Sequence, residues 1–221
     1  MPDHHPGQGS MDTSFKSLAI SAALALSLLA ASCSGGDDGS TPATSSPTPI
    51  DPVTDLVGSG CADYAASVPS GDGSLGAMVH ELVSKALAAN PFVDTFSGAV
   101  SGQVNAEVTI ADRLDAGQFT VFAPVDEAFD KLGTATVARL GTPAGVALLD
   151  SILGYHLIEG RLVPADIDGT HRTIGGSTIT VAGSGDDITV GNGQAHVVCG
   201  GIQTKNATIY LLDTVVTPPG T

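Results

Sequence analysis

Phe119-Thr-Val-Phe-Ala-Pro-Val-Asp-Glu-Ala-Phe129 is the stretch that decides the fold, because it joins a buried strand directly to a helix. The apolar run Phe119–Ala123 predicts a short buried strand, which Pro124 ends. The residues that follow predict a helix, since Asp126 and Glu127 are acids near the positively polarised end of its dipole. A strand followed at once by a helix predicts a chain that mixes both element types.

The chain before Phe119 carries helical periodicity. Apolar residues after Ser74 recur at steps of three and four, which predicts a helix that ends at Asn90-Pro91. We expect Ser74 to cap this helix, and we expect shorter helices over 92–100 and 110–117. The apolar stripe is interpreted as core and comprises Leu75, Met78, Val79, Leu82, Val83, Ala86 and Leu87.

The chain after Phe129 changes from helix to strand. Thr142-Pro143 predicts the start of a helix, because Pro fits the first turn, and this helix continues to Gly154. Alternating apolar residues between Gly-rich turns then predict antiparallel strands. Helices followed by such a sheet indicate an α+β fold. The residues behind these predictions are Val146, Leu149, Ile152, Leu153, Ile179, Val181, Ile188, Val190 and Val197.

The composition limits the class of protein. The chain has 221 residues, of which 42% are hydrophobic, so it can hold one medium domain with a sizeable core, plus appendages. Its formal net charge is −15 and its 8 Lys and Arg residues are scattered, which excludes a basic patch for nucleic acid. The acidity is interpreted as a means of keeping a surface protein soluble.

Residues 1–32 are interpreted as a signal peptide. The run Leu18–Ala31 consists of Leu, Ala, Ile and Ser; it is too short to span a bilayer comfortably and fits the apolar region of such a peptide. Lys16 supplies the positive charge before it. The polar run before Met11 is unusual for a signal peptide, so Met11 is the expected true start.

Cys33 follows small residues and resembles the acceptor cysteine of a bacterial lipobox. The resemblance implies that Cys33 is lipidated and anchors the exported chain to the outer face of the cell membrane. Each buried methylene of the lipid would contribute about 0.8 kcal/mol. Ala30 stands where lipoboxes usually carry Leu, so secretion without lipid is the alternative. After Cys33, the rest of the segment 33–54 is rich in Gly, Ser, Thr, Pro and Asp, which predicts a disordered tether.

Cys61 and Cys199 are the cysteines that remain if lipid occupies Cys33. An even pair in an exported chain predicts a disulfide. Cys61 precedes the first predicted helix and Cys199 lies in a late predicted strand, so the bridge would join the N-terminal edge of the domain to its sheet. Two distant cysteines lack the spacing of a zinc site, and no metal is expected.

Three ordered motifs make the chain similar to the fasciclin domain family. Phe119–Phe129 resembles the first signature of that family, Tyr155-His156 its central pair, and Asn206–Asp213 its second signature. The resemblance implies a fasciclin-like α+β domain over 75–217, an antiparallel β-wedge flanked by helices, with an N-terminal extension at 55–74.

Two further segments resemble the secreted and surface-lipoprotein antigens of mycobacteria within this family. They are Asp55–Cys61 and Val197–Gly201. In that subgroup the matching cysteines are bonded, which implies a Cys61–Cys199 disulfide here. The lipidated members are cell-surface proteins recognised by the host.

Two residues depart from the wider family. Val125 stands where many members carry Thr, so we expect the cap of the following helix to shift to Asp126. Tyr210 stands where many members carry His, which weakens any argument that rests on a His in the last strand.

Tyr155 and His156 are the most tempting site residues. The resemblance links their region to receptor contacts. The alternative is a buried pair whose polar atoms form hydrogen bonds within the fold. We favour this structural role, because the pair follows a packed helix and opens a strand.

The leading hypothesis for function is a non-catalytic adhesion or interaction module on a surface lipoprotein. Its partners would be the membrane, through the lipid, and an unidentified protein or glycan, with a host surface or matrix as candidates. The first alternative is an envelope protein that binds a small apolar ligand. An enzyme is the second alternative and the least favoured, because no catalytic constellation is evident, and no cofactor is expected.

Overall fold

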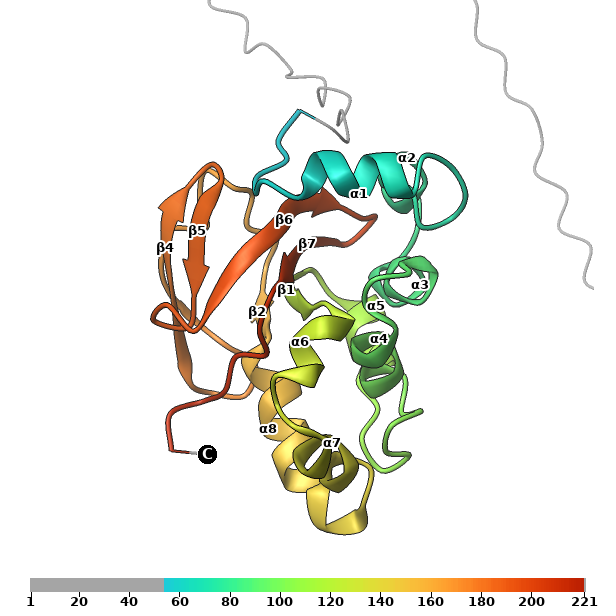
Figure 1. Cartoon of the computed structure of the whole chain (residues 1–221), viewed down its shortest axis with the longest axis vertical. Helices are drawn as coiled ribbons and strands as arrows, with labels where there is room; N and C mark the ends of the chain where they lie inside the picture. The colour runs from blue at the N-terminus through green and yellow to red at the C-terminus, as the bar shows by residue number, and fades with distance from the viewer. Residues whose placement is uncertain (1–53, 221) are drawn as a thin grey trace, which may run out of the picture. The chain divides into compact units, whose positions relative to one another are not determined.

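The computed structural model describes residues 54–220. The expected signal peptide, Cys33 and nearly all of the tether lie outside the described residues. Within 54–220, seven strands form one sheet in the order β2-β1-β7-β6-β5-β4-β3 (Figure 1). The strands are β1 (Phe119–Pro124), β2 (Leu157–Glu159), β3 (Gly169–Arg172), β4 (Thr178–Ser184), β5 (Asp187–Val190), β6 (Ala195–Gln203) and β7 (Ala207–Leu212).

Most helices gather on one side of β1 and β7, whereas β4 and β5 lie on the other side (Figure 1). Eight short α-helices and one 3-10 helix occur in the described range. They are α1 (Cys61–Ser67), α2 (Leu75–Met78), α3 (Val83–Ala89), α4 (Asp94–Val100), α5 (Ala111–Ala116), α6 (Asp126–Asp130), α7 (Thr134–Leu140), η1 (Pro143–Gly145) and α8 (Val146–Tyr155).

The sheet confirms the α+β class and adds one feature to the predicted antiparallel arrangement. β1 pairs with β7 in parallel along its whole length, while the other strand pairs are antiparallel. The parallel pair arises because a long segment, and no hairpin, connects β1 to β7. A bridge between Ile158 and Thr173 links β2 toward β3, so that the sheet nearly closes on itself.

All six residues of β1 are buried. Since successive side chains of a strand point to opposite sides, both faces of β1 lie in the core. Phe119, Val121 and Ala123 belong to the core cluster on the helical side. Phe122 belongs to a second cluster inside the curved sheet, where its ring lies 5.7 Å from that of Tyr210 on β7. The two clusters therefore meet at β1 and β7.

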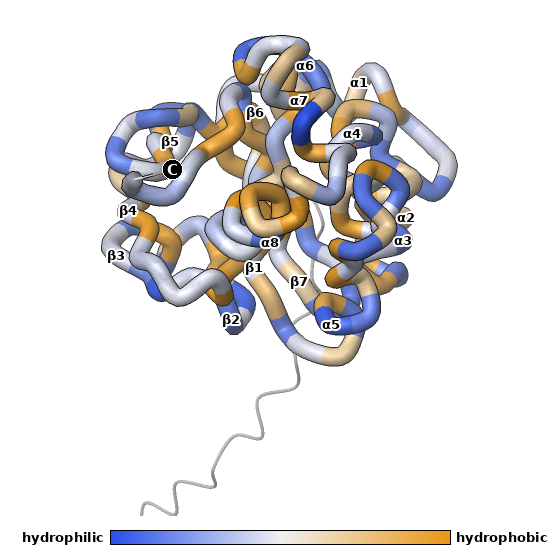
Figure 2. Tube along the Cα trace, turned by 90° about the horizontal axis from the view of Figure 1, so that it is seen from below, coloured by the Kyte–Doolittle hydropathy of each residue, from blue (hydrophilic) through white to orange (hydrophobic). Residues whose placement is uncertain are grey.

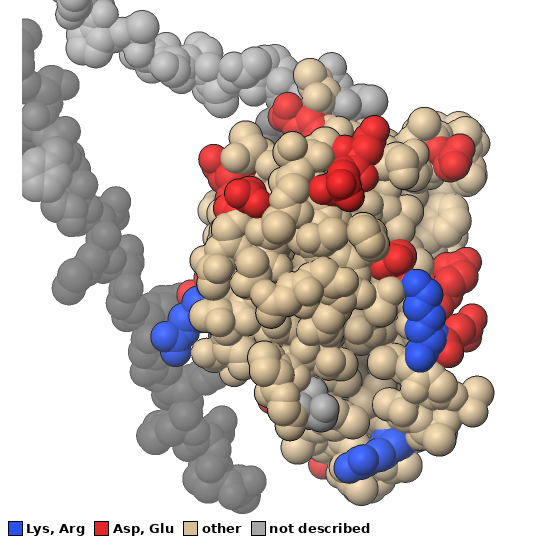
Figure 3. Space-filling model, turned by 60° about the vertical axis from the view of Figure 1, so that its left-hand side comes forward, with Lys and Arg blue, Asp and Glu red and all other residues tan. Residues whose placement is uncertain are grey.

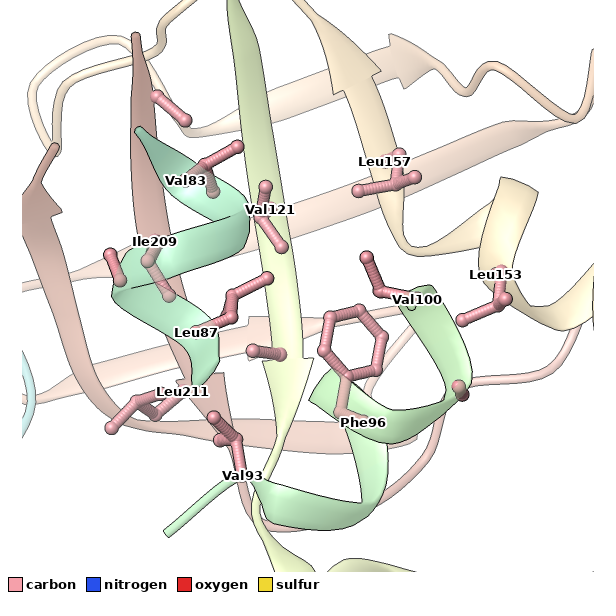
Figure 4. Close-up of a cluster of buried hydrophobic side chains, with 14 of the residues drawn as sticks. Val83, Leu87, Val93, Phe96, Val100, Val121, Leu153, Leu157, Ile209 and Leu211 are labelled. Carbon is pink, nitrogen blue, oxygen red and sulfur yellow. The ribbon is translucent and has the colours of Figure 1, made fainter. Parts of the chain in front are cut away.

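The helical-side cluster fills the space between β1, β7 and the helices α3, α4 and α8 (Figure 4). Burial of each large apolar side chain contributes about 1.5–3 kcal/mol, so this cluster is the main source of stability on that side. The members labelled in Figure 4 are Val83, Leu87, Val93, Phe96, Val100, Val121, Leu153, Leu157, Ile209 and Leu211.

α8 is the helix that agrees best with its prediction from the sequence. Leu149, Ile152 and Leu153 are buried as expected, and Val146 is partly buried against the same cluster. Figure 2 shows α8 end-on, between the strands on one side and the remaining helices on the other. Its position places the end of the helix, and the residues that follow it, at the centre of the domain.

The single helix predicted over 74–90 is wrong, because the chain forms α2 and α3 with a break between them. The side chain of Asn206, between β6 and β7, accepts a hydrogen bond from the amide of Val83 at 2.9 Å and starts α3 there. The amide of Lys205 donates to the carbonyl of Glu81 at 2.8 Å within the break. A tertiary cap therefore overrides the local helical pattern.

Two predicted helix caps are also wrong. Ser74 lies at the N-cap of α2, but its hydroxyl donates to the carbonyl of Gly71 and caps no amide. Asp126 lies inside α6, whose N-cap is Val125. The carboxylate of Asp126 instead accepts a hydrogen bond from the amide of Thr95 at 2.8 Å, so it caps the neighbouring helix α4.

Asn206 connects three further points of the chain besides α3. Its side-chain amide donates to the carbonyls of Leu114 and Gly117 at 2.7 and 2.8 Å, at the end of α5. Its own carbonyl accepts from the amide of Phe119 at 3.2 Å, at the start of β1. One buried side chain therefore holds two helices against the central strands.

We predict that Asn206→Ala lowers the free energy of unfolding by about 2–4 kcal/mol, because the amide of Val83 and two carbonyls lose their partner in a buried place. Urea denaturation of the purified chain measures this change. The control is Gln118→Ala, whose side chain is exposed nearby, with an expected change within about 0.5 kcal/mol. Equal losses in the two variants would contradict the assignment.

Cys61 and Cys199 form a disulfide, with their Cα atoms 4.7 Å apart. The bridge fixes the start of α1 to β6 across a sequence separation of 138 residues. The N-terminal extension is also held by backbone bonds, since Val57 pairs with Gly200. The N-terminal edge is thus joined to the sheet, as the cysteine count predicted.

We predict that mass spectrometry of a non-reduced digest finds the peptides of Cys61 and Cys199 linked. Closure of so long a loop corresponds to about 4–5 kcal/mol in the chain-entropy model, as an upper value. Reduction should therefore lower the urea midpoint of the wild type. The double variant Cys61→Ser/Cys199→Ser should show the lower midpoint with and without reductant. A shift on reduction in the double variant would assign the effect to another group.

Candidate functional site

Tyr155 and His156 lie where α8 passes into β2. Tyr155 is the last residue of α8, His156 is its C-cap, and β2 begins at Leu157, so the pair ends the helix and does not open the strand. Both side chains are buried, with 1% of Tyr155 and 0% of His156 exposed. They face different clusters: Tyr155 belongs to the one inside the sheet, whereas the ring of His156 lies 5.9 Å from Phe96 of α4.

His156 has a hydrogen-bond partner at each ring nitrogen. Nε2 faces the amide of Val216 at 3.3 Å, so it accepts, and Nδ1 then carries the proton and donates to the carbonyl of Ile152 at 2.7 Å. Its backbone carbonyl accepts from the amide of Phe122 in β1 at 2.9 Å. The residue therefore joins α8, β1 and the C-terminal segment after β7.

Burial also sets the charge of His156. Desolvation lowers the pKa of His156 to about 4, and the hydrogen bond to the carbonyl of Ile152 opposes this shift only in part. The imidazole is therefore neutral at the pH of most extracellular fluids. Protonation would also place a second N–H against the amide of Val216, which has no oxygen to offer.

The Tyr155 side chain contributes to the core through its ring and not through its hydroxyl group. This oxygen is buried and has no hydrogen-bond partner within the described residues. Burial raises the pKa of the Tyr155 phenol, because the phenolate would be desolvated. The expectation that the polar atoms of both residues bond within the fold thus holds for His156 and is wrong for Tyr155.

Neither residue is available to a partner in this structure. A receptor contact needs exposed atoms, and the pair has almost none. The geometry supports the structural role favoured from the sequence, with His156 as the connecting group and Tyr155 as a core side chain.

The hollows of the described surface lie elsewhere. One of about 500 Å³ lies between β2 and β3 and is lined by Ile158, Glu159, His171 and Arg172, among others. A smaller one of about 230 Å³ lies between α1 and α6, and we name it the α1–α6 pocket. Its lining comprises Gly60, Asp63, Tyr64, Ser67, Phe92, Val125, Glu127, Val198, Cys199 and Leu211.

The α1–α6 pocket was not predicted from the sequence. Its residues come from α1, from the segment before α4, from the start of α6, and from β6 and β7. The only sequence signal was Cys61–Cys199, because that disulfide brings α1 against β6. Phe92 and Val198, both half-buried, were expected to be a helix residue and a strand residue without further role.

Across 54–220, no group of three or more His, Cys, Asp or Glu side chains could hold a metal ion. Over that range, no helix is long and apolar enough to cross a membrane.

We predict that His156→Gln lowers stability at neutral pH by about 1–3 kcal/mol, because at least one buried bond is lost. The folded-state pKa of about 4 lies below the usual 6.5, so the wild type should lose stability as pH falls from 6.5 through 4. The variant should lose less over this range. Melting curves at several pH values measure both effects.

A control for this experiment is His171→Gln, since His171 is only partly buried. The control should keep the pH dependence of the wild type. If His156→Gln melts like the wild type and yet fails to bind a partner that the wild type binds, the structural role is refuted and the receptor contact is supported.

A family model of the fasciclin domain matches residues 93–218. The chain is 46% identical over 208 residues to the cell surface glycolipoprotein MPB83 of Mycobacterium bovis, covering 90% of this chain and 93% of that protein. It is 47% identical over 165 residues to the immunogenic protein MPB70 of the same species, covering 75% of this chain and 83% of that protein.

A solved structure of a FAS1 domain pair from the insect cell adhesion molecule Fasciclin I shares the fold. The TM-score is 0.55 at 17% sequence identity, over 64% of this chain and 52% of that one. The chain thus spans about half of that pair. The match of the family model over α4 to β7, and the identity to two mycobacterial proteins, agree with the architecture described above. The chain belongs to the fasciclin domain family.

Proposed function

We propose that this protein is a lipoprotein held at the outer face of the cell membrane, with a fasciclin domain that acts as a non-catalytic interaction module. The observation that carries the proposal is the 46% identity, over 90% of the chain, to a cell surface glycolipoprotein. The fasciclin domain supports a role in adhesion at the surface. The cysteine that follows the apolar leader, Cys33, is the proposed site of the lipid.

The construction of the domain suits display outside the cell. The Cys61–Cys199 disulfide is stable in an oxidising compartment. Two core clusters share β1 and β7, so the domain is held rigidly around its centre. The acidic character continues on the surface, where Figure 3 shows a face on which Asp and Glu side chains are prominent and Lys and Arg are few.

The alternative of a small apolar ligand is not favoured by the α1–α6 pocket or by the hollow between β2 and β3. Sites for small molecules usually have about 300–1,000 Å³ and enclose most of the ligand. The α1–α6 pocket, whose lining is largely apolar, has about 230 Å³. The larger hollow between β2 and β3 includes the charged Glu159 and Arg172.

The proposed non-catalytic role is supported by the burial and the hydrogen bonds of His156. A general base must reach its substrate with a free ring nitrogen. Both ring nitrogens of His156 are engaged in the fold, and the side chain is fully buried. This arrangement leaves His156 without a free ring nitrogen for general base catalysis.

We predict that a fatty-acid probe fed to living cells labels the wild-type chain and does not label Cys33→Ala. The matched control Ser34→Ala should be labelled like the wild type, because Ser34 is beside the acceptor and carries no thiol. The wild type should stay with the membrane fraction and be cut by protease added to intact cells. Equal labelling of wild type and Cys33→Ala, or release of the wild type into the medium, would contradict the lipid anchor.

A further inference from the structure

The α1–α6 pocket has an aromatic wall that is held in place. The ring of Tyr64 lies 5.4 Å from the ring of Phe92, and the two planes are tilted. The Tyr64 hydroxyl donates to the carbonyl of Gly73 at 2.6 Å, which fixes that ring from behind. Phe92 is half-buried, so part of its ring remains open to the pocket.

The other walls are fixed by backbone bonds. The amide of Gly60 donates to the carbonyl of Val198 at 2.9 Å, which joins α1 to β6. The amide of Val125 donates to the carbonyl of Leu212 at 2.9 Å, which joins the start of α6 to β7. Val125 and Val198 are both half-buried. The pocket therefore offers a preformed apolar surface, which reduces the entropic cost of binding.

Two exposed carboxylates accompany this apolar surface. Asp63 and Glu127 line the pocket from α1 and α6. Within residues 54–220, neither takes part in an ion pair or a side-chain hydrogen bond, whereas nearby Lys131 on α6's C-terminal side is engaged with Asp213 at 3.5 Å. Glu127 also lines the adjacent hollow, together with Asp130 of α6.

Charge and shape together limit what this pocket can take. Two uncompensated carboxylates on a chain of net charge −15 repel anions and favour a cation. The half-buried side chains of Phe92, Val125 and Val198 favour an apolar group between them. A volume of about 230 Å³ suits one or two apolar side chains and is small for a drug-sized ligand.

We propose that the α1–α6 pocket docks a peptide segment of a partner protein in which an apolar side chain is flanked by Lys or Arg. The apolar side chain enters between Phe92, Val125 and Val198, and the flanking cations meet Asp63 and Glu127. The proposal rests on the proposed function as an interaction module and names the chemistry of its partner. A single pocket of this size binds weakly, and many copies at one surface raise the overall affinity.

The first experiment uses three labelled synthetic peptides and the purified full chain, and it follows fluorescence anisotropy. The first peptide has the centre Lys-Leu-Lys, the second Glu-Leu-Glu and the third Lys-Ser-Lys, in the same Gly-Ser flanks. The first should bind measurably more tightly than the other two, and binding should weaken as salt is added. Equal binding of the first and third peptides would overturn the apolar part of the proposal. Equal binding of the first and second would overturn the cationic part.

The location is tested with a photo-reactive leucine at the centre of the first peptide. Cross-links should map by mass spectrometry to the peptides that contain Tyr64, Phe92, Val125 or Val198. Cross-links confined to other parts of the chain would overturn the site.

Two double variants with the same change of net charge complete the test. Asp63→Asn/Glu127→Gln should bind the first peptide about tenfold more weakly at low salt, since each exposed pair contributes modestly. Asp186→Asn/Asp187→Asn, at the exposed turn between β4 and β5, should bind like the wild type. Equal weakening in both variants would assign the effect to net charge and overturn the pocket.

These outcomes separate the pocket from the function on which it rests. Loss of lipid labelling or surface exposure, with peptide binding by the purified chain intact, would refute the lipoprotein and leave the pocket standing. Absence of peptide binding in a chain that is lipidated and exposed on cells would refute the pocket alone.

Discussion

The packing of helices against the central strands depends on one buried amide, that of Asn206. Its oxygen starts α3 at Val83, and its nitrogen closes the end of α5 at Leu114 and Gly117. Its backbone carbonyl receives the first amide of β1, from Phe119. A helix end that is buried without a partner is costly, and here a single side chain satisfies groups on two helices. Asn206 is also the first residue of the second signature, Asn206–Asp213.

The central strands β1 and β7 impose a second packing constraint on the domain. They run parallel, and each contributes to both core clusters, so every side chain along them must fit one cluster or the other. His156 completes the arrangement, since it joins the end of α8 to β1 and to the segment after β7. Tyr155 and His156, which the sequence offered as a candidate binding motif, therefore belong to the structural core. We propose that a partner binds instead at the surface, in the pocket between α1 and α6 whose floor is formed by residues of β6 and β7.

Several features of this domain follow from the sequence, because they are local or, for the disulfide, because only two cysteines are available to pair. The continuous apolar run of β1 predicted a buried strand, and the spacing of Leu149, Ile152 and Leu153 predicted the buried face of α8. The pairing of Cys61 with Cys199 followed from arithmetic, once Cys33 was set aside for lipid. The lipid itself and the signal peptide lie outside the described residues and remain predictions from the leader sequence.

Other features were decided only by the tertiary structure, because they join residues far apart in the chain. The break between α2 and α3 depends on Asn206, which lies 123 residues after Val83. Asp126 caps a helix that precedes it by 31 residues, and no periodicity within one segment reveals such a partner. The neutral state of His156 follows from its burial, and its ring accepts a hydrogen bond from the amide of Val216, 60 residues away. Sequence by itself determined the mixture of helices and strands and the apolar face of α8; the tertiary structure decided where helices begin and break and which buried donors meet which acceptors, because hydrogen bonds depend on position in space and not on spacing along the chain.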